Sequence, residues 1–268
     1  MTPTLEILIP VKNPDERLVQ TAASLAAQSD RSFAVRLSDN CSQTGAEHIE
    51  NAARQLTAAG ITVHLTKTSR EIKRLEHRNL IHSEAQADWL KLVHAGDILQ
   101  TSYVEQLRRR IVEQPQAALI RCDAELQTEW GSDTARAPFK EPRITAARVA
   151  DYFPASVVWL SHAANIAYSR LAWLEAGGYS NHLPGFASLN LNLTLALHHG
   201  VENIAAPLVR VESADRLPLN ESAGERVNLP LELWLILRQA RNYCLAAKVH
   251  WHCRWPWWRA TTARMGSW

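Results

Sequence analysis

The chain has 268 residues, of which 46% are hydrophobic and 21% are charged, so it is long enough for one large globular domain. Its net charge of +2 is too small to attract nucleic acid as a whole, which excludes that class of partner. The four cysteines form no CxxC pair, and the first residues lack the basic and apolar segments of a secretory signal. We therefore expect a cytoplasmic protein with reduced thiols.

Short apolar runs alternate with helical patterns in the first half of the chain. They predict strands at residues 5–10, 33–37, 61–65, 89–93 and 117–122, with intervening helices that end near residues 25, 59, 87 and 113. This alternation predicts a parallel, doubly wound sheet, which binds ligands at the carboxyl ends of its strands. The polar loops at residues 11–13, 38–45 and 94–97 are therefore expected to form one crevice.

The second half is less regular. Residues 128–143 are polar and contain a glycine and two prolines, which predicts a flexible loop. Strands are expected at 163–168 and 204–211, and helices at 171–176 and 189–199. A long helix from residue 229 leads into a tail that holds six of the ten tryptophans and has a net charge of +5 from residue 231 onward. We place a domain boundary there, between residues 1–215 and 216–268.

The tryptophan-rich tail has two interpretations. Indole rings and cations suit a membrane interface, which favours peripheral contact with the inner face of the cytoplasmic membrane. Alternatively, Trp234 and its neighbours pack against the rest of the protein. Pro256 interrupts the aromatic and basic run at residues 251–259, so a continuous helix through that run is not expected.

Five motifs, in order along the chain, resemble those of glycosyltransferase family 2. They are Ile7-Leu8-Ile9-Pro10-Val11-Lys12-Asn13, Asp39-Asn40-Cys41-Ser42-Gln43-Thr44-Gly45, Arg78-Asn79, His94-Ala95-Gly96-Asp97 and Gly177-Gly178-Tyr179. Each motif alone is weak evidence, but five in the correct order and on the expected elements are much stronger. The resemblance covers roughly residues 5–212.

The resemblance implies a GT-A type α/β fold: a doubly wound, mixed sheet with a Rossmann-like nucleotide-binding half at residues 1–100 and an acceptor half at 150–215. It implies inverting transfer of a sugar from a nucleotide-diphosphate donor to a saccharide or lipid-linked acceptor, in the synthesis of cell-surface polysaccharides. It assigns catalysis to Asp97, which together with His94 is expected to bind Mg²⁺ or Mn²⁺. The implied substrate-binding residues are Pro10, Val11, Asn13, Asp39, Asn40, Arg74, Arg78, Asn79, His94, Gly177 and Gly178.

Two departures from the family pattern matter. His94 and Gly96 stand where the metal-binding motif usually has acidic residues, and Asn190 and Asn192 stand where the catalytic base is expected. An amide does not accept a proton near neutral pH, so the base is unassigned. His162, His182 and Glu175 are the candidates near that region.

These departures keep a second hypothesis open, in which the chain is a non-catalytic relative that binds a nucleotide sugar or a partner enzyme. A nucleotidyltransferase is disfavoured because the loop after the first strand has no glycine, and an oxidoreductase because no GxGxxG follows that strand. Simpler interpretations also exist for single residues. Asp39 could close an Asx turn, Asp97 could cap a helix, and Gly177-Gly178 could end one.

Overall fold

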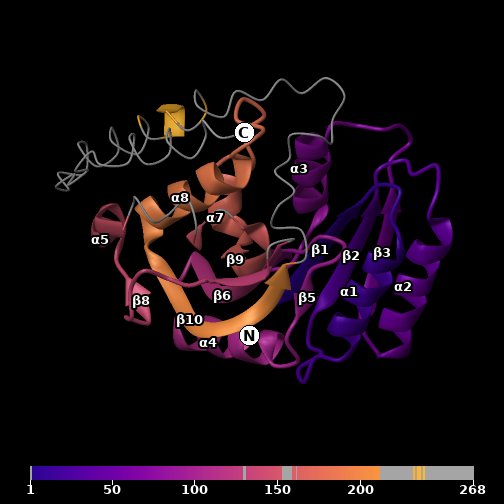
Figure 1. Ribbon diagram of the computed structural model, residues 1–268, viewed down its shortest axis with the longest axis horizontal. Helices are drawn as coiled ribbons and strands as arrows, with labels where there is room; N and C mark the ends of the chain where they lie inside the picture. Colours follow the sequence, from indigo (N-terminus) through magenta and orange to yellow (C-terminus); the bar gives the residue numbers. More distant parts are fainter. Residues whose placement is uncertain are drawn as a thin grey trace.

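The computed structural model describes residues 2–128, 131–152, 159–160 and 162–211, together with residues 232, 234–236 and 238. Within these residues a single sheet runs through the molecule, and helices cover both of its faces (Figure 1). The sheet has ten strands, eight of which follow the order β3-β2-β1-β4-β9-β6-β10-β5.

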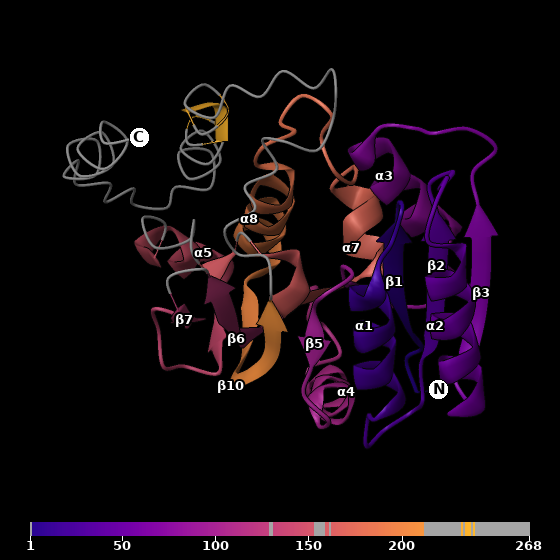
Figure 2. The same cartoon turned by 45° about the vertical axis from the view of Figure 1, so that its right-hand side comes forward.

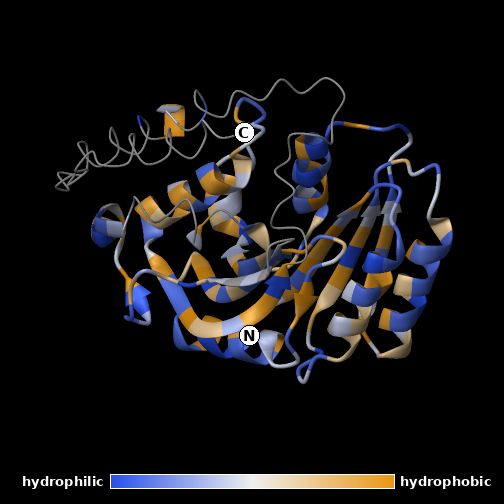
Figure 3. Ribbon diagram, viewed as in Figure 1, coloured by the Kyte–Doolittle hydropathy of each residue, from blue (hydrophilic) through white to orange (hydrophobic). Residues whose placement is uncertain are grey.

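The first half of the chain forms a regular alternation of strands and helices. Its elements are β1 (Leu5–Val11), α1 (Glu16–Ala26), β2 (Ala34–Asp39), α2 (Ala46–Ala58), β3 (Thr62–Lys67), α3 (Arg74–Glu84) and β4 (Trp89–Leu92). The four strands are parallel, with β1 between β2 and β4. Because β1 is covered on both faces, nearly all of its side chains are apolar and buried (Figure 3).

The second half adds strands of both directions. Its elements are β5 (Ile98–Leu99), α4 (Tyr103–Glu113), β6 (Leu119–Thr128), β7 (Gly131–Ala135), β8 (Arg143–Ile144), α5 (Ala146–Val149), the 3-10 turns η1 (Ala150–Tyr152) and η2 (Ala163–Asn165), β9 (Ile166–Ser169), α7 (Arg170–Glu175), α8 (Ala187–His199) and β10 (Val201–Val211). Strand β9 lies between β4 and β6 and is antiparallel to both. Strand β10 is parallel to β6 and antiparallel to β5.

Two apolar cores lie on opposite faces of this sheet. One core joins odd-numbered residues of β1 to α1, α2 and α4, and the other joins Leu8 and β4 to α3, α7 and α8. The side chains of β1 alternate between the two cores because successive residues of a strand point to opposite faces. Helices α3 and α7 lie beside each other over the second core in both views (Figures 1 and 2).

Most of the predicted elements are present, with three corrections. Residues 128–143 do not form only a flexible loop, because β7 pairs with β6 and β8 pairs with β10. Isolated polar strands of this kind give no apolar alternation, so the sequence did not reveal them. Helix α3 ends at Glu84 and not near residue 87, and the two-residue strand β5 was not predicted.

The C-terminal segment is described only in part. Glu232, residues 234–236 and Arg238 are helical, whereas the rest of the predicted helix and the tail at 249–268 lie outside the described residues. Ile236 is buried, and the Arg238 guanidinium lies 5.4 Å from the ring centroid of the exposed Trp234. Among the described residues, no helix has the length and apolar character needed to cross a membrane.

Candidate functional site

Strands β1, β2 and β4 have their carboxyl ends beside one another. We call this side of the sheet, where the strands end, the carboxyl edge. Just past the strand ends, the backbone N–H of Asn40 donates to the Val11 carbonyl (2.8 Å). The N–H of Val93 likewise donates to the Leu8 carbonyl (2.9 Å). The loops that follow these strands are therefore neighbours, as the parallel order requires. Pro10 is half-buried at this edge, whereas the Val11 side chain belongs to the core.

Asn13 joins the first of these loops to the second. Its backbone has a left-handed φ of 47°, a conformation that asparagine adopts more readily than most residues. Its side-chain carbonyl accepts hydrogen bonds from the backbone N–H groups of Gln43 (2.8 Å) and Thr44 (3.3 Å). Its own backbone N–H donates to the Ser42 hydroxyl (2.7 Å). Asn13 is thus a brace between the two loops.

Asp39 and Asn40 shape the second loop at the end of β2. The Asp39 carboxylate accepts a hydrogen bond from the Ser42 N–H (2.8 Å) and lies 3.2 Å from the Lys67 ammonium. Burial opposes its ionisation, but the hydrogen bonds from Ser42 and the charge of Lys67 outweigh burial and hold the pKa of Asp39 below its usual value. The Asn40 amide accepts from the Ile72 N–H (3.0 Å) and donates to the Ile72 carbonyl (2.8 Å). Asp39 therefore closes a turn while remaining ionised.

Asn79 connects α3 to the Gly177-Gly178-Tyr179 turn, 100 residues away. Its amide nitrogen donates to the Tyr179 carbonyl and its amide oxygen accepts from the Tyr179 N–H, both at 2.9 Å. Gly178 has a φ of 71°, and a Cβ there would lie 2.8 Å from the Trp173 ring and 2.9 Å from the Asn79 amide oxygen. A larger residue at Gly178 would therefore break the contact. Helix α7 ends at Glu175, just before this turn, which agrees with the alternative interpretation that Gly177-Gly178 ends a helix.

Arg78, His94 and Asp97 form a row at the crevice. A guanidinium can only donate, so the Arg78 Nη2 donates to His94 Nε2, at 2.6 Å. His94 Nδ1 consequently carries the ring hydrogen, and it lies 3.5 Å from Asp97 Oδ2. The same carboxylate oxygen accepts from the His94 backbone N–H at 2.8 Å. Burial, and then the Arg78 charge, lower the pKa of His94, which keeps the ring neutral.

Thr21 of α1 holds the loop that carries this row, and the sequence analysis did not identify it. Its hydroxyl donates to the Asp97 carbonyl and accepts from the Gly96 N–H, both at 2.9 Å. Thr21 is fully buried on the same helix face as Leu18, Ala22 and Leu25. A hydroxyl on an otherwise apolar face needs a partner, and that was the signal available in the sequence.

A buried hydrogen-bonded chain lies behind Arg78. His82 Nδ1 donates to the Arg78 carbonyl (2.6 Å), so its Nε2 accepts from the Tyr168 hydroxyl (2.5 Å). The Tyr168 oxygen in turn accepts from the Tyr179 hydroxyl (2.9 Å). Burial lowers the pKa of His82 to about 3, which keeps it neutral. The Arg78 guanidinium also lies 5.9 Å from the centroid of the Tyr179 ring.

The amino end of α8 receives its contacts from distant parts of the chain. The Arg74 Nη2 donates to the Pro184 carbonyl (3.0 Å). Phe186, at the N-cap position, has no side-chain acceptor, and the Glu232 carboxylate accepts instead from the N–H groups of Gly185 (2.8 Å) and Phe186 (3.2 Å). Glu232 is buried. The C-terminal segment thus supplies a carboxylate near the end of α8 where the sequence lacks acids.

His162 is the best placed of the three candidate bases. It is half-buried, and the nearby negative charge of Asp97 partly offsets the lowering of its pKa by burial. The segment that follows it is tied to β4, because the buried Lys91 ammonium donates to the carbonyls of Ala163, Ala164 and Ile166. His182 and Glu175, by contrast, are exposed.

The residues in this row do not fit a divalent cation held by the protein alone. Such ions take about six oxygen or nitrogen ligands, and one carboxylate and one imidazole are present here. The His94 Nε2 lone pair faces a guanidinium, and one Asp97 oxygen accepts the His94 N–H. Among the described residues, no group of three or more His, Cys, Asp or Glu side chains is arranged to hold a metal ion.

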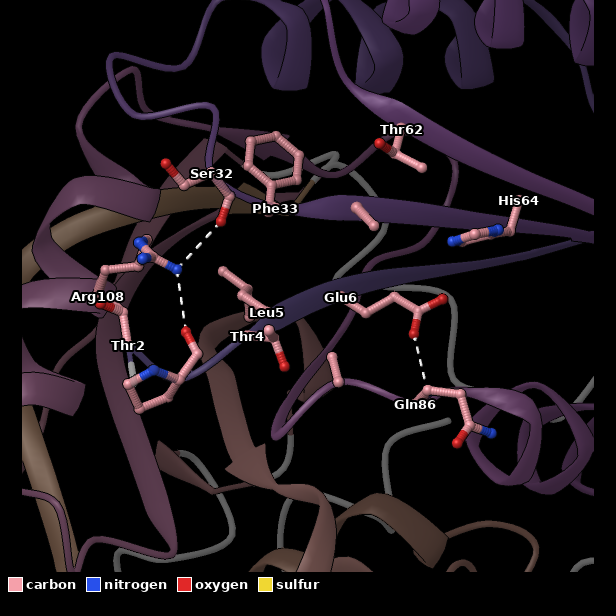
Figure 4. A pocket seen from close by; sticks show the side chains of 13 residues that line it. Thr2, Thr4, Leu5, Glu6, Ser32, Phe33, Thr62, His64, Gln86 and Arg108 are labelled. Atoms are coloured by element: carbon pink, nitrogen blue, oxygen red, sulfur yellow. Dashed lines mark hydrogen bonds between the residues drawn. The ribbon is translucent and has the colours of Figure 1, made fainter.

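A separate hollow of about 480 Å³ lies at the opposite end of the strands (Figure 4). Its lining comes mainly from the amino ends of β1, β2 and β3, and two of its charged residues, Arg108 and Glu6, have protein partners. Arg108 donates to the carbonyls of Pro3 (3.2 Å) and Ser32 (3.1 Å), and Glu6 pairs with Arg36 (2.8 Å). We therefore place the functional site at the carboxyl edge.

Comparisons with known proteins give structural likenesses. Neither a protein-family model nor a curated protein matches the sequence. TarS 1–349 from S. aureus, in complex with UDP-GlcNAc, matches with a TM-score of 0.69 and 13% identity, over 92% of this chain and 68% of that one. A second TarS structure matches with a TM-score of 0.68, and there the chain covers 41% of TarS.

A third likeness is to the mannosyltransferase PcManGT from Pyrobaculum calidifontis, in complex with GDP-Man and Mn²⁺. Its TM-score is 0.57 at 13% identity, over 100% of this chain and 81% of that one. These likenesses, together with the mixed and mostly parallel sheet, establish the architecture. The chain has the GT-A type α/β fold that the sequence predicted.

Proposed function

We propose that the chain is a glycosyltransferase that moves a sugar from a nucleotide-diphosphate donor to a saccharide or lipid-linked acceptor. The observation that carries the proposal is the row of Arg78, His94 and Asp97 at the carboxyl edge of a GT-A type sheet. Guanidinium groups suit diphosphate oxygens, and open α/β sheets bind ligands at this edge. Two proteins of the same fold were solved with UDP-GlcNAc and GDP-Man.

In this proposal residues 1–100 bind the donor and residues 150–215 bind the acceptor. Pro10 and Asp39 line the nucleobase and ribose pocket, and Val11, whose side chain is in the core, supports the end of β1 beneath it. An ionised carboxylate such as Asp39 accepts hydrogen bonds from base N–H or ribose hydroxyl groups. Asn13 and Asn40 contribute by fixing the loop backbones. Asn79 joins the donor and acceptor halves, because it bonds to Tyr179 in the turn that contains Gly177 and Gly178.

His162 is our candidate for the general base. A direct displacement, which inverts the sugar, needs a group that takes the proton of the acceptor hydroxyl opposite the leaving diphosphate. A half-buried histidine with a lowered pKa is neutral near pH 7 and can take that proton. Asn190 and Asn192 cannot, and the Asn192 amide donates instead to the buried Leu160 carbonyl (2.7 Å).

Donor turnover tests this proposal. UDP-, GDP- and dTDP-sugars are screened by thermal shift, and release of the nucleoside diphosphate is then followed with and without acceptor saccharides and Mn²⁺. We expect one nucleotide class to bind and to be released, and His162→Gln to lower kcat by about 100-fold or more. His182→Gln is the matched control. Equal kcat values in both variants would reject His162 as the base.

The missing acids at positions 190 and 192 also support a second candidate function, a non-catalytic relative that binds a nucleotide sugar or a partner enzyme. The same assays separate the two. Tight nucleotide-sugar binding with no release of nucleoside diphosphate, across a panel of acceptors, would favour the non-catalytic relative.

We further propose that the protein acts in cell-surface polysaccharide synthesis at the inner face of the cytoplasmic membrane, with the tryptophan-rich tail in contact with lipid. The support is the composition of the tail, six tryptophans and a net charge of +5 from residue 231 onward. Flotation with anionic liposomes, with and without residues 249–268, tests the contact. We expect the full chain to float with the liposomes and the shortened form not to. Equal flotation of both forms would reject the membrane contact.

A further inference from the structure

A nucleoside diphosphate carries negative charge that its binding site must neutralise. At the carboxyl edge, two other cations already have acidic partners, because Lys12 pairs with Glu71 and Lys67 pairs with Asp39. Arg78 instead donates to a neutral imidazole, His94. Among the described residues, no acidic side chain forms an ion pair with Arg78 to offset its charge.

Arg78 is also fixed in place. Its guanidinium lies 2.6 Å from His94 Nε2 and 5.9 Å from the centroid of the Tyr179 ring, and its carbonyl accepts from His82. The bond to His94 uses one of the five N–H groups of a guanidinium, and the planar fork suits bidentate binding of phosphate oxygens. Arg74 lies one helical turn earlier on the same face of α3, so the two arginines are neighbours.

Asp97 contacts His94, which in turn contacts Arg78. One carboxylate oxygen accepts the His94 backbone N–H and faces the His94 ring, whose other nitrogen accepts from Arg78. For His94 to ligate a metal through Nε2, the Arg78 contact would have to break, and the metal would lie beside a guanidinium. His94 and Asp97 therefore orient the guanidinium of Arg78 and not a metal ion.

We propose that Arg78, supported by Arg74 and oriented through His94 and Asp97, binds the diphosphate of the donor in place of a divalent metal ion. This inference rests on the proposed function and specifies the charge that holds its substrate. In it, Arg78 is the binding residue, and His94 and Asp97 are positioning residues. The diphosphate would bind equally well in the presence of a chelator and in the presence of Mn²⁺.

Calorimetric binding of UDP and GDP, each in EDTA and in Mn²⁺, tests the proposal. For the nucleotide that binds, we expect Kd values within about twofold in the two conditions. Arg78→Gln is expected to weaken binding roughly 10- to 100-fold in both, as loss of charge-assisted hydrogen bonds does. Arg109→Gln is the matched control, since Arg109 is exposed on α4 and pairs with Glu113 of the same helix.

Two further measurements exclude misfolding and hidden metal. Arg78→Lys keeps the charge but loses the fork, so we expect it to bind more weakly than the wild type and more tightly than Arg78→Gln, with all melting temperatures recorded. The electron paramagnetic resonance spectrum of Mn²⁺ without nucleotide is expected to be unchanged when the protein is added in EDTA-free buffer.

The failures are distinguishable. Binding that is lost in EDTA and restored by Mn²⁺, with Arg78→Gln equal to the wild type in Mn²⁺, would overturn the metal-free site and leave the glycosyltransferase proposal intact. The absence of binding by any nucleoside diphosphate or nucleotide sugar, with or without Mn²⁺, would overturn both.

Discussion

The two halves of the molecule use their polar residues differently. In the nucleotide half, asparagines at the crevice mainly bond to backbone, as Asn13 does with Gln43 and Asn40 with Ile72. In the acceptor half, positions expected to be acidic are amides, and Asn192 is bound to a buried carbonyl. The charged chemistry is thus concentrated in the row of Arg78, His94 and Asp97. Residues of a motif can therefore still fix the local backbone after its ionisable side chains have been replaced by amides.

The sharpest test of this comparison is Asp97→Asn. Asparagine can still accept the His94 N–H but has no charge, so we expect donor turnover to fall about 100- to 1000-fold while the fold is kept. If Asp97 acts through Arg78, nucleotide affinity falls by the same factor in EDTA and in Mn²⁺. Asp151→Asn, on an exposed carboxylate, serves as the control. A loss seen only in Mn²⁺ would show a metal ligand instead.

Asn79→Ala tests whether the two halves depend on one clamp. The change leaves the backbone N–H and carbonyl of Tyr179 without their partner, and we expect it to cost about 2–4 kcal/mol of unfolding free energy. Urea unfolding followed by circular dichroism measures it. Asn51→Ala, on the exposed face of α2, should change stability by less than about 0.5 kcal/mol. Equal losses of stability in Asn79→Ala and Asn51→Ala would show that the Asn79–Tyr179 contact does not stabilise the protein.

His82 makes the contact between the halves sensitive to acid. Its folded-state pKa of about 3 lies below the ordinary histidine value of 6.5, so between these pH values the unfolded chain binds a proton that the folded state does not. This contribution to stability is complete above pH 6.5 and is lost as the pH falls, by about 2 kcal/mol between pH 7 and 5. His82→Gln, which can still donate and accept, should lose less over that range. If His82→Gln lost as much unfolding free energy between pH 7 and 5 as the wild type, this role would be contradicted. It would also be contradicted if His64→Gln, at an exposed position, reduced that loss as much as His82→Gln does.

Glu232→Ala has the smallest expected effect. The carboxylate caps α8 from the C-terminal segment, so its loss should cost about 1 kcal/mol, and Glu232→Gln somewhat less. Thermal unfolding at neutral pH measures both. Glu113→Ala, at the carboxyl end of α4, is the control, and a cost no larger than in this control would argue against the cap.

The sequence predicted the nucleotide half well because its signals are local. Strands alternate with helices from β1 to β4, and that alternation predicts a parallel sheet. The positions of Asp39, His94 and Asp97 followed from the ends of the strands, whereas Arg78, inside α3, was identified from the family resemblance. Because parallel strands end on the same side of a sheet, the loops after these strands could be placed together without knowledge of tertiary contacts.

The contacts that organise the site could not be predicted in the same way. Asn79 meets Tyr179 across 100 residues, and Arg74 meets Pro184 across 110. Nothing in the local pattern gives such pairs, and the same holds for Glu232 at α8. The polar strands β7 and β8 were also missed, because pairing along a sheet stabilises them without apolar alternation. The sequence therefore located the residues, and the tertiary contacts define what each does.

The placement of β9 between β4 and β6 has a consequence for the order of folding. β6 is made before β9, yet it joins the β4 edge of the sheet only through β9. While the chain is being synthesised, the parallel block β1–β4 can form first, but its β4 edge stays open until residue 169 is available. We expect pulsed hydrogen exchange during refolding to protect β1 and β2 before β6 and β10. The fold thus carries a built-in delay, during which an exposed strand edge must avoid pairing with another chain.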